Sequence, residues 1–305
     1  MTARSDLFLG SLFAMTAIAI YAGMFAVGRH GAGNGLDGFD QSAARFLMSC
    51  ILLAPLALRR ASGIWTRLGL FRILVLMSLQ GAVYSVVFLS ALTYAPAVYG
   101  AAFVPGLQPF VVVVLGFLIL AERPGKIKTI AFAICFAGCS IMIIGPSTAP
   151  AANLSAGLAL FGVSTLMWGS YTFLLRVWSI EPLDALVVIG VSSGILFLPP
   201  YFAIREFVAL EAPLSALLLQ LIYQGVFVGI LAALLFASAV QKIGSLSVAA
   251  LTPTMPALAT IIALVTLGED PSVFQWAGIG LVSIGLIISK SPKIVISYFK
   301  NTSTP

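Results

Sequence analysis

The sequence predicts an all-α integral membrane protein with ten transmembrane helices, arranged as two inverted five-helix repeats around a central cavity. Three observations lead to this fold class. The 305 residues are 60% hydrophobic and only 9% charged, whereas soluble domains carry about 25% charged residues. Ten apolar runs are long enough to cross a bilayer. Like residues also recur at one constant offset from the first run to the fifth.

Helices are expected in these runs because lipid offers no partner to backbone polar groups. Strands of a membrane barrel would alternate polar and apolar residues over about ten positions, and residues 111–120 do not alternate. A spanning helix needs about 20 mostly apolar residues. Windows of that kind, bounded by glycine, proline or charge, place the spans at 7–28, 42–58, 70–94, 97–120, 128–146, 154–177, 183–204, 213–240, 245–267 and 273–289.

Lysine and arginine gather in alternate loops. With the N-terminus inside, cytoplasmic segments hold thirteen of them, the outer loops hold Arg29 and Arg205, and Arg45 lies near the outer end of the second span. This bias follows the positive-inside rule. It predicts a multi-pass protein of the plasma membrane, the inner membrane in a bacterium, with both termini cytoplasmic. No basic patch interleaved with exposed aromatics indicates nucleic-acid binding.

Groups for catalysis or metal binding are scarce. Cys50, Cys135 and Cys139 lie within apolar runs without His or carboxylate nearby, and the single histidine, His30, is in the first outer loop. A metal site would need clustered ligands, and an enzyme would need a nucleophile–base set. No metal, no cofactor and no catalytic residue is therefore expected, and a membrane-embedded enzyme is a poor alternative.

An internal repeat relates the two halves at an offset of 147 residues. The matched pairs include Gly10 with Gly157, Arg29 with Arg176, Asp37 with Asp184, Pro109 with Pro256, and Glu122 with Glu269. Each copy holds five spans, an odd number, so the copies lie upside down relative to each other. Many secondary transporters build one central site between such repeats. We expect the first repeat in 1–150, the second in 151–292 and a cytoplasmic tail in 293–305.

Each copy also carries a mid-helix proline, a helix end with glutamate followed by proline, and a final helix containing glycine. The motifs are Pro109, Ala121-Glu122-Arg123-Pro124 and Gly138 in the first copy, and Pro256, Gly268-Glu269-Asp270-Pro271 and Gly285 in the second. In these motifs the chain resembles the EamA-type transporters of the drug/metabolite transporter superfamily. It looks most like the YddG-type exporters of aromatic and other amino acids. The resemblance implies ten helices, cytoplasmic termini and alternating access.

The two matched prolines, Pro109 and Pro256, are predicted to interrupt their helices near the middle of the membrane, because proline removes a helix hydrogen bond. Interruptions at matching positions of two repeats point to a binding site, although a kink that serves only packing is the other interpretation. Glu122 and Glu269 stand at helix ends, where we expect them to form gate salt bridges rather than ligands.

Amide and aromatic side chains are the candidates for lining the cavity. Gln108 and Trp168 are the strongest, because an amide at mid-bilayer depth needs a partner or a cavity. Aromatic residues at helical spacing are the further candidates, with helix packing as the alternative for each: Tyr84, Phe88, Tyr99, Phe103, Tyr171, Tyr223 and Phe227.

This lining suits a zwitterion with an apolar or aromatic side chain. We therefore expect a lipid-embedded exporter, plausibly monomeric, of small metabolites such as aromatic and neutral amino acids. Export of amphipathic organic cations is the alternative, because ring faces attract cations. Sugar phosphates are disfavoured, since no Lys or Arg is expected at mid-membrane. No Asp or Glu lies near the middle of a span, so a proton relay is not expected.

Overall fold

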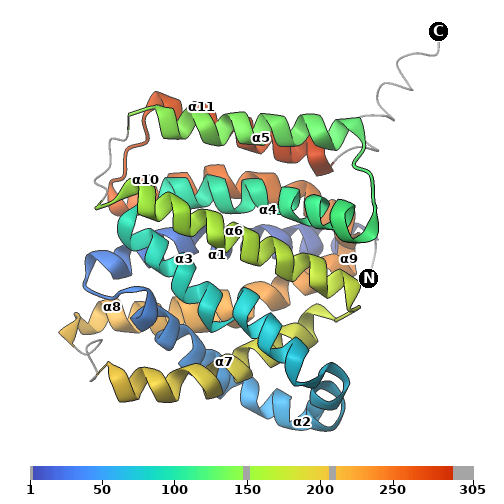
Figure 1. Ribbon diagram of the computed structural model, residues 1–305, viewed down its shortest axis with the longest axis vertical. Coiled ribbons are helices and arrows are strands. Elements are labelled where there is room, and N and C mark those ends of the chain that lie inside the picture. The colour runs from blue at the N-terminus through green and yellow to red at the C-terminus, as the bar shows by residue number, and fades with distance from the viewer. Residues whose placement is uncertain (1–2, 147–151, 206–210, 291–305) are drawn as a thin grey trace.

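The computed structural model describes residues 3–146, 152–205 and 211–290. These residues form helices that run side by side between two faces of the molecule (Figure 1). Helix α1 begins and α11 ends at one of them, here named the N face; the other is the opposite face. Nine helical stretches of the described chain are long and apolar enough to cross a membrane, and Val273–Ser289 is a shorter apolar helix. The predicted all-α membrane fold is confirmed.

The first repeat contains five helices, whose bounds are Ala3–Gly33 (α1), Gly38–Gln80 (α2), Ala82–Tyr94 (α3), Ala97–Leu120 (α4) and Lys126–Ile144 (α5). Helix α2 covers the second expected span and enters the third. It turns at Gly69, whose φ of 70° lies in the region that favours glycine. The third expected span, 70–94, is not one helix, because the chain breaks between α2 and α3 at Gly81.

The second repeat contains Leu154–Val177 (α6), Pro182–Ile204 (α7), Leu214–Leu219 (α8), a π-helix at Gln220–Leu231 (η2), Ala232–Leu251 (α9), a 3-10 turn at Thr252–Thr254 (η3), Met255–Leu267 (α10) and Val273–Lys290 (α11). Helix α9 joins the end of the eighth expected span to the start of the ninth and turns at Gly244, where φ is 81°. Gly69 and Gly244 thus let the chain bend where another residue would be strained.

The two repeats are inverted. Figure 1 shows α1 leaving the N face and α6 running toward it. Equivalent helices of the two repeats pack on each other, α2 against α7 and α5 against α11, while α1 packs on α9 and α10 and α6 packs on α3 and α4. The predicted repeat boundary at 150–151 and the tail 293–305 lie outside the described residues.

Only the second repeat carries the interruption expected at the matched prolines. Helix α4 runs as one helix through Pro105 and Pro109, so the prediction of two interrupted helices is wrong for the first repeat. Around Pro253 and Pro256 the chain instead changes to the η3 turn before α10 begins. In α10 Pro256 falls in the first turn, where the missing N–H of proline costs no helix hydrogen bond.

Two glycines bring α5 and α11 into backbone contact. A Cβ added at Gly278 would lie 2.6 Å from the Gly138 carbonyl oxygen, and one at Gly138 would lie 2.7 Å from the Gly278 carbonyl oxygen. Small residues at such positions let membrane helices approach closely. Gly280, two residues along the same helix, has no neighbour within 4 Å of an added Cβ.

We expect Gly278→Val to lower the free energy of unfolding by about 1–3 kcal/mol, because the added atoms force α5 and α11 apart. Thermal unfolding of the detergent-solubilised chain measures this change. Gly280→Val, the matched control in the same helix, should leave the midpoint unchanged. Equal destabilisation by both substitutions would mean that helix propensity, and not the α5–α11 contact, sets the effect.

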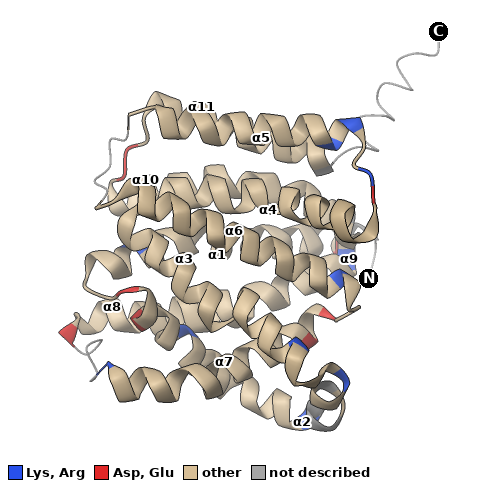
Figure 2. Cartoon of the chain, in the orientation of Figure 1, with Lys and Arg blue, Asp and Glu red and all other residues tan. Residues whose placement is uncertain are grey.

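Charged residues gather at the helix ends (Figure 2), and the excess of Lys and Arg predicts that the N face is cytoplasmic. A reporter enzyme that works only in the cytoplasm should then be active when it is fused after Pro305. A reporter enzyme that works only outside the cytoplasm should be active when it is inserted in the 147–152 loop. Detection of both reporters on one side of the membrane would contradict the five-plus-five arrangement.

Candidate functional site

Two arginine–glutamate pairs connect the repeats, and each takes one residue from either half. Arg29 at the end of α1 pairs with Glu269 beyond α10, with 3.2 Å between Nε and Oε1. Arg176 at the end of α6 pairs with Glu122 beyond α4. Arg29 and Arg176 are 147 positions apart, as are Glu122 and Glu269. The two pairs are therefore equivalents under the repeat, one near each face, and they join helix ends as the sequence predicted for the glutamates.

The Arg29–Glu269 pair lies at the opposite face and is part-buried, with side chains 19% and 10% exposed. Arg29 Nη1 also donates to the carbonyl oxygens of Leu92, at 2.8 Å, and Thr93, at 3.1 Å. The second carboxylate oxygen of Glu269 accepts the backbone N–H of Ala97, at 2.9 Å. One ion pair thus holds together the ends of α1, α3 and α10 and the start of α4.

The Arg176–Glu122 pair at the N face is exposed, with side chains 58% and 46% accessible. Within the described chain their side chains hydrogen-bond only to each other. The repeat offset would place the partners of a closed pair at Ala239, Val240 and Gly244 in α9. In the described structure none of these three residues bonds to Arg176 or Glu122. Likewise α1 packs on α3 and α4 of its own repeat, but no comparable packing joins α6 to α9 or α10. The helix ends around Arg29 and Glu269 are therefore closed at the opposite face, whereas α6 is apart from α9 and α10 at the N face.

The two glutamates differ in proton affinity. Burial raises the pKa of Glu269 above its usual range, against the opposing effect of Arg29 and of the backbone N–H groups. The hydrogen bond from Arg176 lowers the pKa of the exposed Glu122. Enclosure by the helix ends therefore favours the protonated glutamate. A falling pH should accordingly stabilise the closed state, since the state with the higher pKa binds more protons.

A cavity of about 380 Å³ opens beyond the Arg29–Glu269 pair at the opposite face. Its lining includes the pair itself together with His30, Asn34 and Thr93. The polar lining gives water access to the outer side of the pair. Solutes at this face therefore meet Arg29 and Glu269 before they can reach the space between the repeats.

Gln108 and Trp168, the strongest sequence candidates, lie next to each other across the repeat boundary. Gln108 Nε2 in α4 donates to Thr172 Oγ1 in α6, at 2.9 Å. The Thr172 hydroxyl donates in turn to the Trp168 carbonyl oxygen, also at 2.9 Å, and the Trp168 side chain is partly buried against the central hydrophobic core. Sequence reasoning missed Thr172, although it follows Trp168 by four residues and so shares its helix face.

The aromatic candidates of the first repeat are packed into the core. Tyr84 and Phe88 stack with ring centroids 5.8 Å apart, and Phe88 also contacts Phe161 of the second repeat. The Tyr99 hydroxyl donates to the Met142 carbonyl oxygen, at 3.4 Å, and the Tyr99 and Phe103 rings meet edge to face. Phe88 and Tyr99 have no exposed surface in this arrangement, so contact with a substrate would require movement.

The candidates of the second repeat are more accessible. Tyr171 is partly buried and packs against a hydrophobic cluster that includes Phe46 and Ile180. The Tyr223 hydroxyl donates to the Ile20 carbonyl oxygen in α1, at 3.0 Å, and Phe227 meets the Tyr223 ring edge to face while 37% of its surface stays exposed. A binding role for each of these residues stays a prediction.

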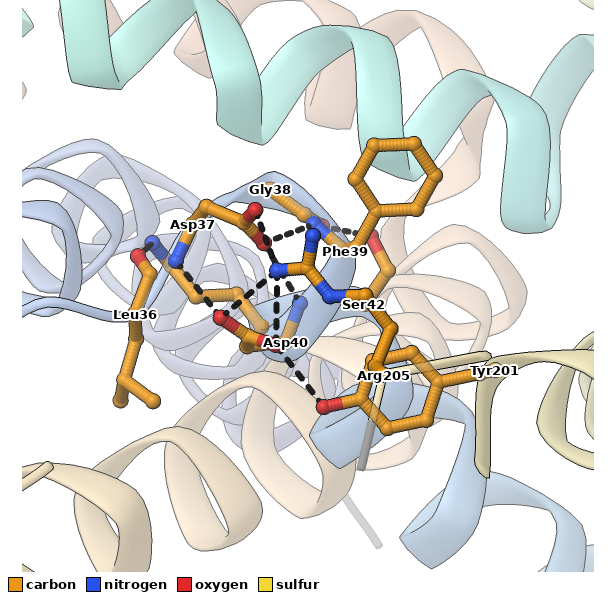
Figure 3. A network of polar contacts seen from close by, with 9 residues as sticks. Leu36, Asp37, Gly38, Phe39, Asp40, Ser42, Tyr201 and Arg205 are labelled. Atoms are coloured by element: carbon orange, nitrogen blue, oxygen red, sulfur yellow. Dashed lines mark hydrogen bonds and ion pairs between the residues drawn. The ribbon is translucent and has the colours of Figure 1, made fainter. Parts of the chain in front are cut away.

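A separate polar network fixes α2 to α7 (Figure 3). Asp37 and Asp40 form a capping box at the start of α2. The Tyr201 hydroxyl donates to Asp40, at 2.8 Å, and Arg205 donates to both aspartates. Burial would raise the pKa of Asp37, but the Asp40 N–H and the Arg205 guanidinium lower it overall. The acids are thus occupied in holding the helix ends together.

The repeat equivalent of Asp37 is Asp184, which pairs with Arg67 at 2.5 Å and ties α7 to α2 near the N face. Helices α2 and α7 are therefore tied at both faces. Both Arg–Glu pairs are formed as well, but only the Arg29–Glu269 pair is bonded to further helix ends. Among the described residues, no three His, Cys, Asp or Glu side chains gather as a metal site would require.

Comparison with known proteins gives a family and a fold. The model of the EamA-like transporter family matches the chain twice, over residues 8–144 and 155–290. Twenty chains of solved structures match as well. One of them, described as "Crystal structure of protein", is 18% identical, covers 95% of this chain and 98% of its own, and superposes with a TM-score of 0.61. No curated protein sequence matches significantly.

The raised pKa of Glu269 yields a test of closure at the opposite face. In a variant with the native cysteines replaced by alanine, Ala97→Cys places a thiol beside the Glu269 carboxylate. We expect a membrane-impermeant thiol reagent to label it more slowly as the pH falls toward the raised pKa, because protonation favours the closed state.

Adding Glu269→Gln controls for the effect of pH on the reagent chemistry. The ratio of the labelling rates with and without Glu269 should change with pH. A constant ratio would show that protonation of Glu269 does not influence closure.

Proposed function

The chain belongs to the EamA-like transporter family, and we propose that it exports aromatic and neutral amino acids across the plasma membrane by alternating access. The observation that carries the proposal is the pair of equivalent ion pairs, one enclosed by helix ends and one left exposed. Inverted repeats supply two related gates around one site. The gate at the opposite face is enclosed by helix ends, and the gate at the N face is exposed. With the N face in the cytoplasm, this arrangement corresponds to an inward-open transporter.

The reverse state follows from the same symmetry. Approach of α6 to α9 would offer Arg176 the carbonyl groups of Ala239 and Val240, and would offer Glu122 the backbone N–H of Gly244. The contacts of Arg29 with Leu92 and Thr93 would be given up at the same time. The exchange replaces one set of hydrogen bonds by an equivalent set, so the two states can differ little in free energy.

The substrate class rests on the groups between α4 and α6. Gln108 and Thr172 provide amide and hydroxyl groups for a polar substrate, and Trp168 provides a ring face against which an apolar or aromatic side chain can pack. Ring faces also attract organic cations, so amphipathic amines are the second candidate class.

A proton-coupled mechanism is not favoured by the arrangement of acids. Asp37 and Asp40 are engaged by Arg205 and Tyr201 at the helix end, and Glu122 and Glu269 serve the gates. Proton relays ordinarily use carboxylates or histidines within the bilayer. We therefore propose transport down the substrate gradient, by a protein that can work as a monomer with both termini in the cytoplasm.

Transport of labelled phenylalanine into liposomes containing the purified chain tests this proposal. It should proceed without a pH gradient, and Glu122→Gln should slow it without abolishing it, because closure at the N face loses one ionic partner. Gln108→Leu and Trp168→Ala should reduce uptake about tenfold or more through loss of polar and ring contacts.

Phe136→Ala, an aromatic truncation at a side chain that is 63% exposed on the outside of the bundle, is the matched control and should transport normally. Strict dependence on a proton gradient would contradict the proposed energetics. Uptake of organic amines in preference to amino acids would show that amphipathic amines, the second candidate class, are the substrates.

A further inference from the structure

Arg45 carries its charge inside a membrane-spanning helix. It lies seven residues after Gly38, where α2 begins, which places its Cα roughly 10 Å into the span at 1.5 Å per residue. The hydrocarbon core is about 30 Å thick. The residue therefore lies deeper than its position near the outer end of the second expected span indicated. Charged residues at such depth face a partner or a water-filled cavity and often mark substrate pathways.

Arg45 has no acidic partner in the described part of the chain. The ion pairs engage other basic residues, namely Arg29, Arg67, Arg176, Arg205 and Lys242. The Arg45 Nη1 donates to Ser85 Oγ at 3.4 Å, near the limit for a hydrogen bond, and the guanidinium lies 5.9 Å from the Phe46 ring centroid. No Arg45 nitrogen is both fully buried and without a hydrogen-bond partner. The unused donors therefore reach accessible space.

Tyrosines from other helices surround this cation. Tyr21 of α1 and Tyr84 of α3 are its electrostatic neighbours, and Tyr171 of α6 is a neighbour of Tyr21. Within the described residues the three hydroxyls have no protein partner, and none of them is sealed from solvent. Helices of both repeats thus bring one guanidinium and three tyrosines near one another inside the bundle, with Tyr84 buried.

The repeat does not require a charge at this place. The equivalent of Arg45 in the second half is Ser192, a buried residue whose hydroxyl has no partner. The fold is therefore compatible with a small neutral side chain at this position of the repeat. An unpaired charge in low dielectric is expensive, so Arg45 needs a compensating anion or water that the chain itself does not supply.

We propose that the Arg45 guanidinium binds the carboxylate of the transported amino acid, with the hydroxyls of Tyr21, Tyr84 and Tyr171 completing a polar site in the central cavity. The inference rests on the proposed transport function and names the group that recognises its substrate. Guanidinium matches a carboxylate with two parallel hydrogen bonds. A single cation suits a monoanion better than a phosphate dianion, and it repels organic amines that lack a carboxylate.

Binding of three related ligands to the purified full-length chain, measured by calorimetry, tests the assignment. Phenylalanine has both charges, 3-phenylpropionate keeps only the carboxylate, and phenethylamine keeps only the ammonium. We expect the wild-type chain to bind the two carboxylates more tightly than the amine. Arg45→Gln should weaken both carboxylates about ten- to a hundredfold and leave phenethylamine unchanged or tighter.

Arg45→Lys keeps the charge without the planar fork and should restore part of the affinity for phenylalanine. Arg123→Gln is the matched control, because Arg123 is exposed in the loop between α4 and α5, outside the proposed site. The ligand preference of the wild-type chain and the Arg45→Lys variant keep the test valid if Arg45→Gln does not fold.

The outcomes separate this inference from the proposed function. Phenylalanine binding that Arg45→Gln leaves unchanged, or equal weakening of all three ligands, would overturn the role of Arg45 alone. A wild-type chain that binds phenethylamine and neither carboxylate would overturn the amino-acid function itself. Arg45-dependent binding of a sugar phosphate in place of phenylalanine would overturn the assignment to a carboxylate.

Discussion

A part-buried guanidinium–carboxylate pair is costly to break, because the loss of one partner leaves the other charge buried without compensation. The Arg29–Glu269 pair is such a contact, and it gathers the ends of α1, α3 and α10 with the start of α4. These contacts lie at the opposite face. Because the repeat supplies the same two residue types again as Arg176 and Glu122, the chain holds a second contact of this kind at the N face, where the helix ends are apart.

The remainder of the bundle behaves as a frame for these two contacts. Helices α2 and α7 are tied near both faces, through Asp37 with Arg205 and through Asp184 with Arg67. Backbone contact at Gly138 and Gly278 holds α5 to α11. Neither connection has to break when α1 and α6 exchange neighbours. The proposed alternating access would therefore leave both connections in place.

The space between the repeats combines two kinds of chemistry. Gln108 and Thr172 join the halves through an amide and a hydroxyl, and the Trp168 carbonyl accepts from that hydroxyl. Arg45 and three tyrosines add a positive charge with polar neighbours. An ammonium finds hydroxyl and carbonyl oxygens there, a carboxylate finds the guanidinium, and an apolar side chain finds rings. This division of contacts suits a zwitterion better than a simple amine.

The sequence by itself determined the spans, their inversion and the equivalence of Glu122 with Glu269, because composition and a fixed offset are properties of the chain alone. The expected spans 97–120 and 154–177 coincide with α4 and α6. Only the tertiary structure decided that α4 passes through Pro109 unbroken while the chain turns before Pro256. It also decided that one Arg–Glu pair is enclosed and its equivalent exposed, and that Arg45 has no acidic partner among the described residues. These features arise from contacts between helices distant in sequence. Inverted repeats of one sequence pattern can occupy unlike environments, so identical residues at matched positions do not reveal which gate is closed.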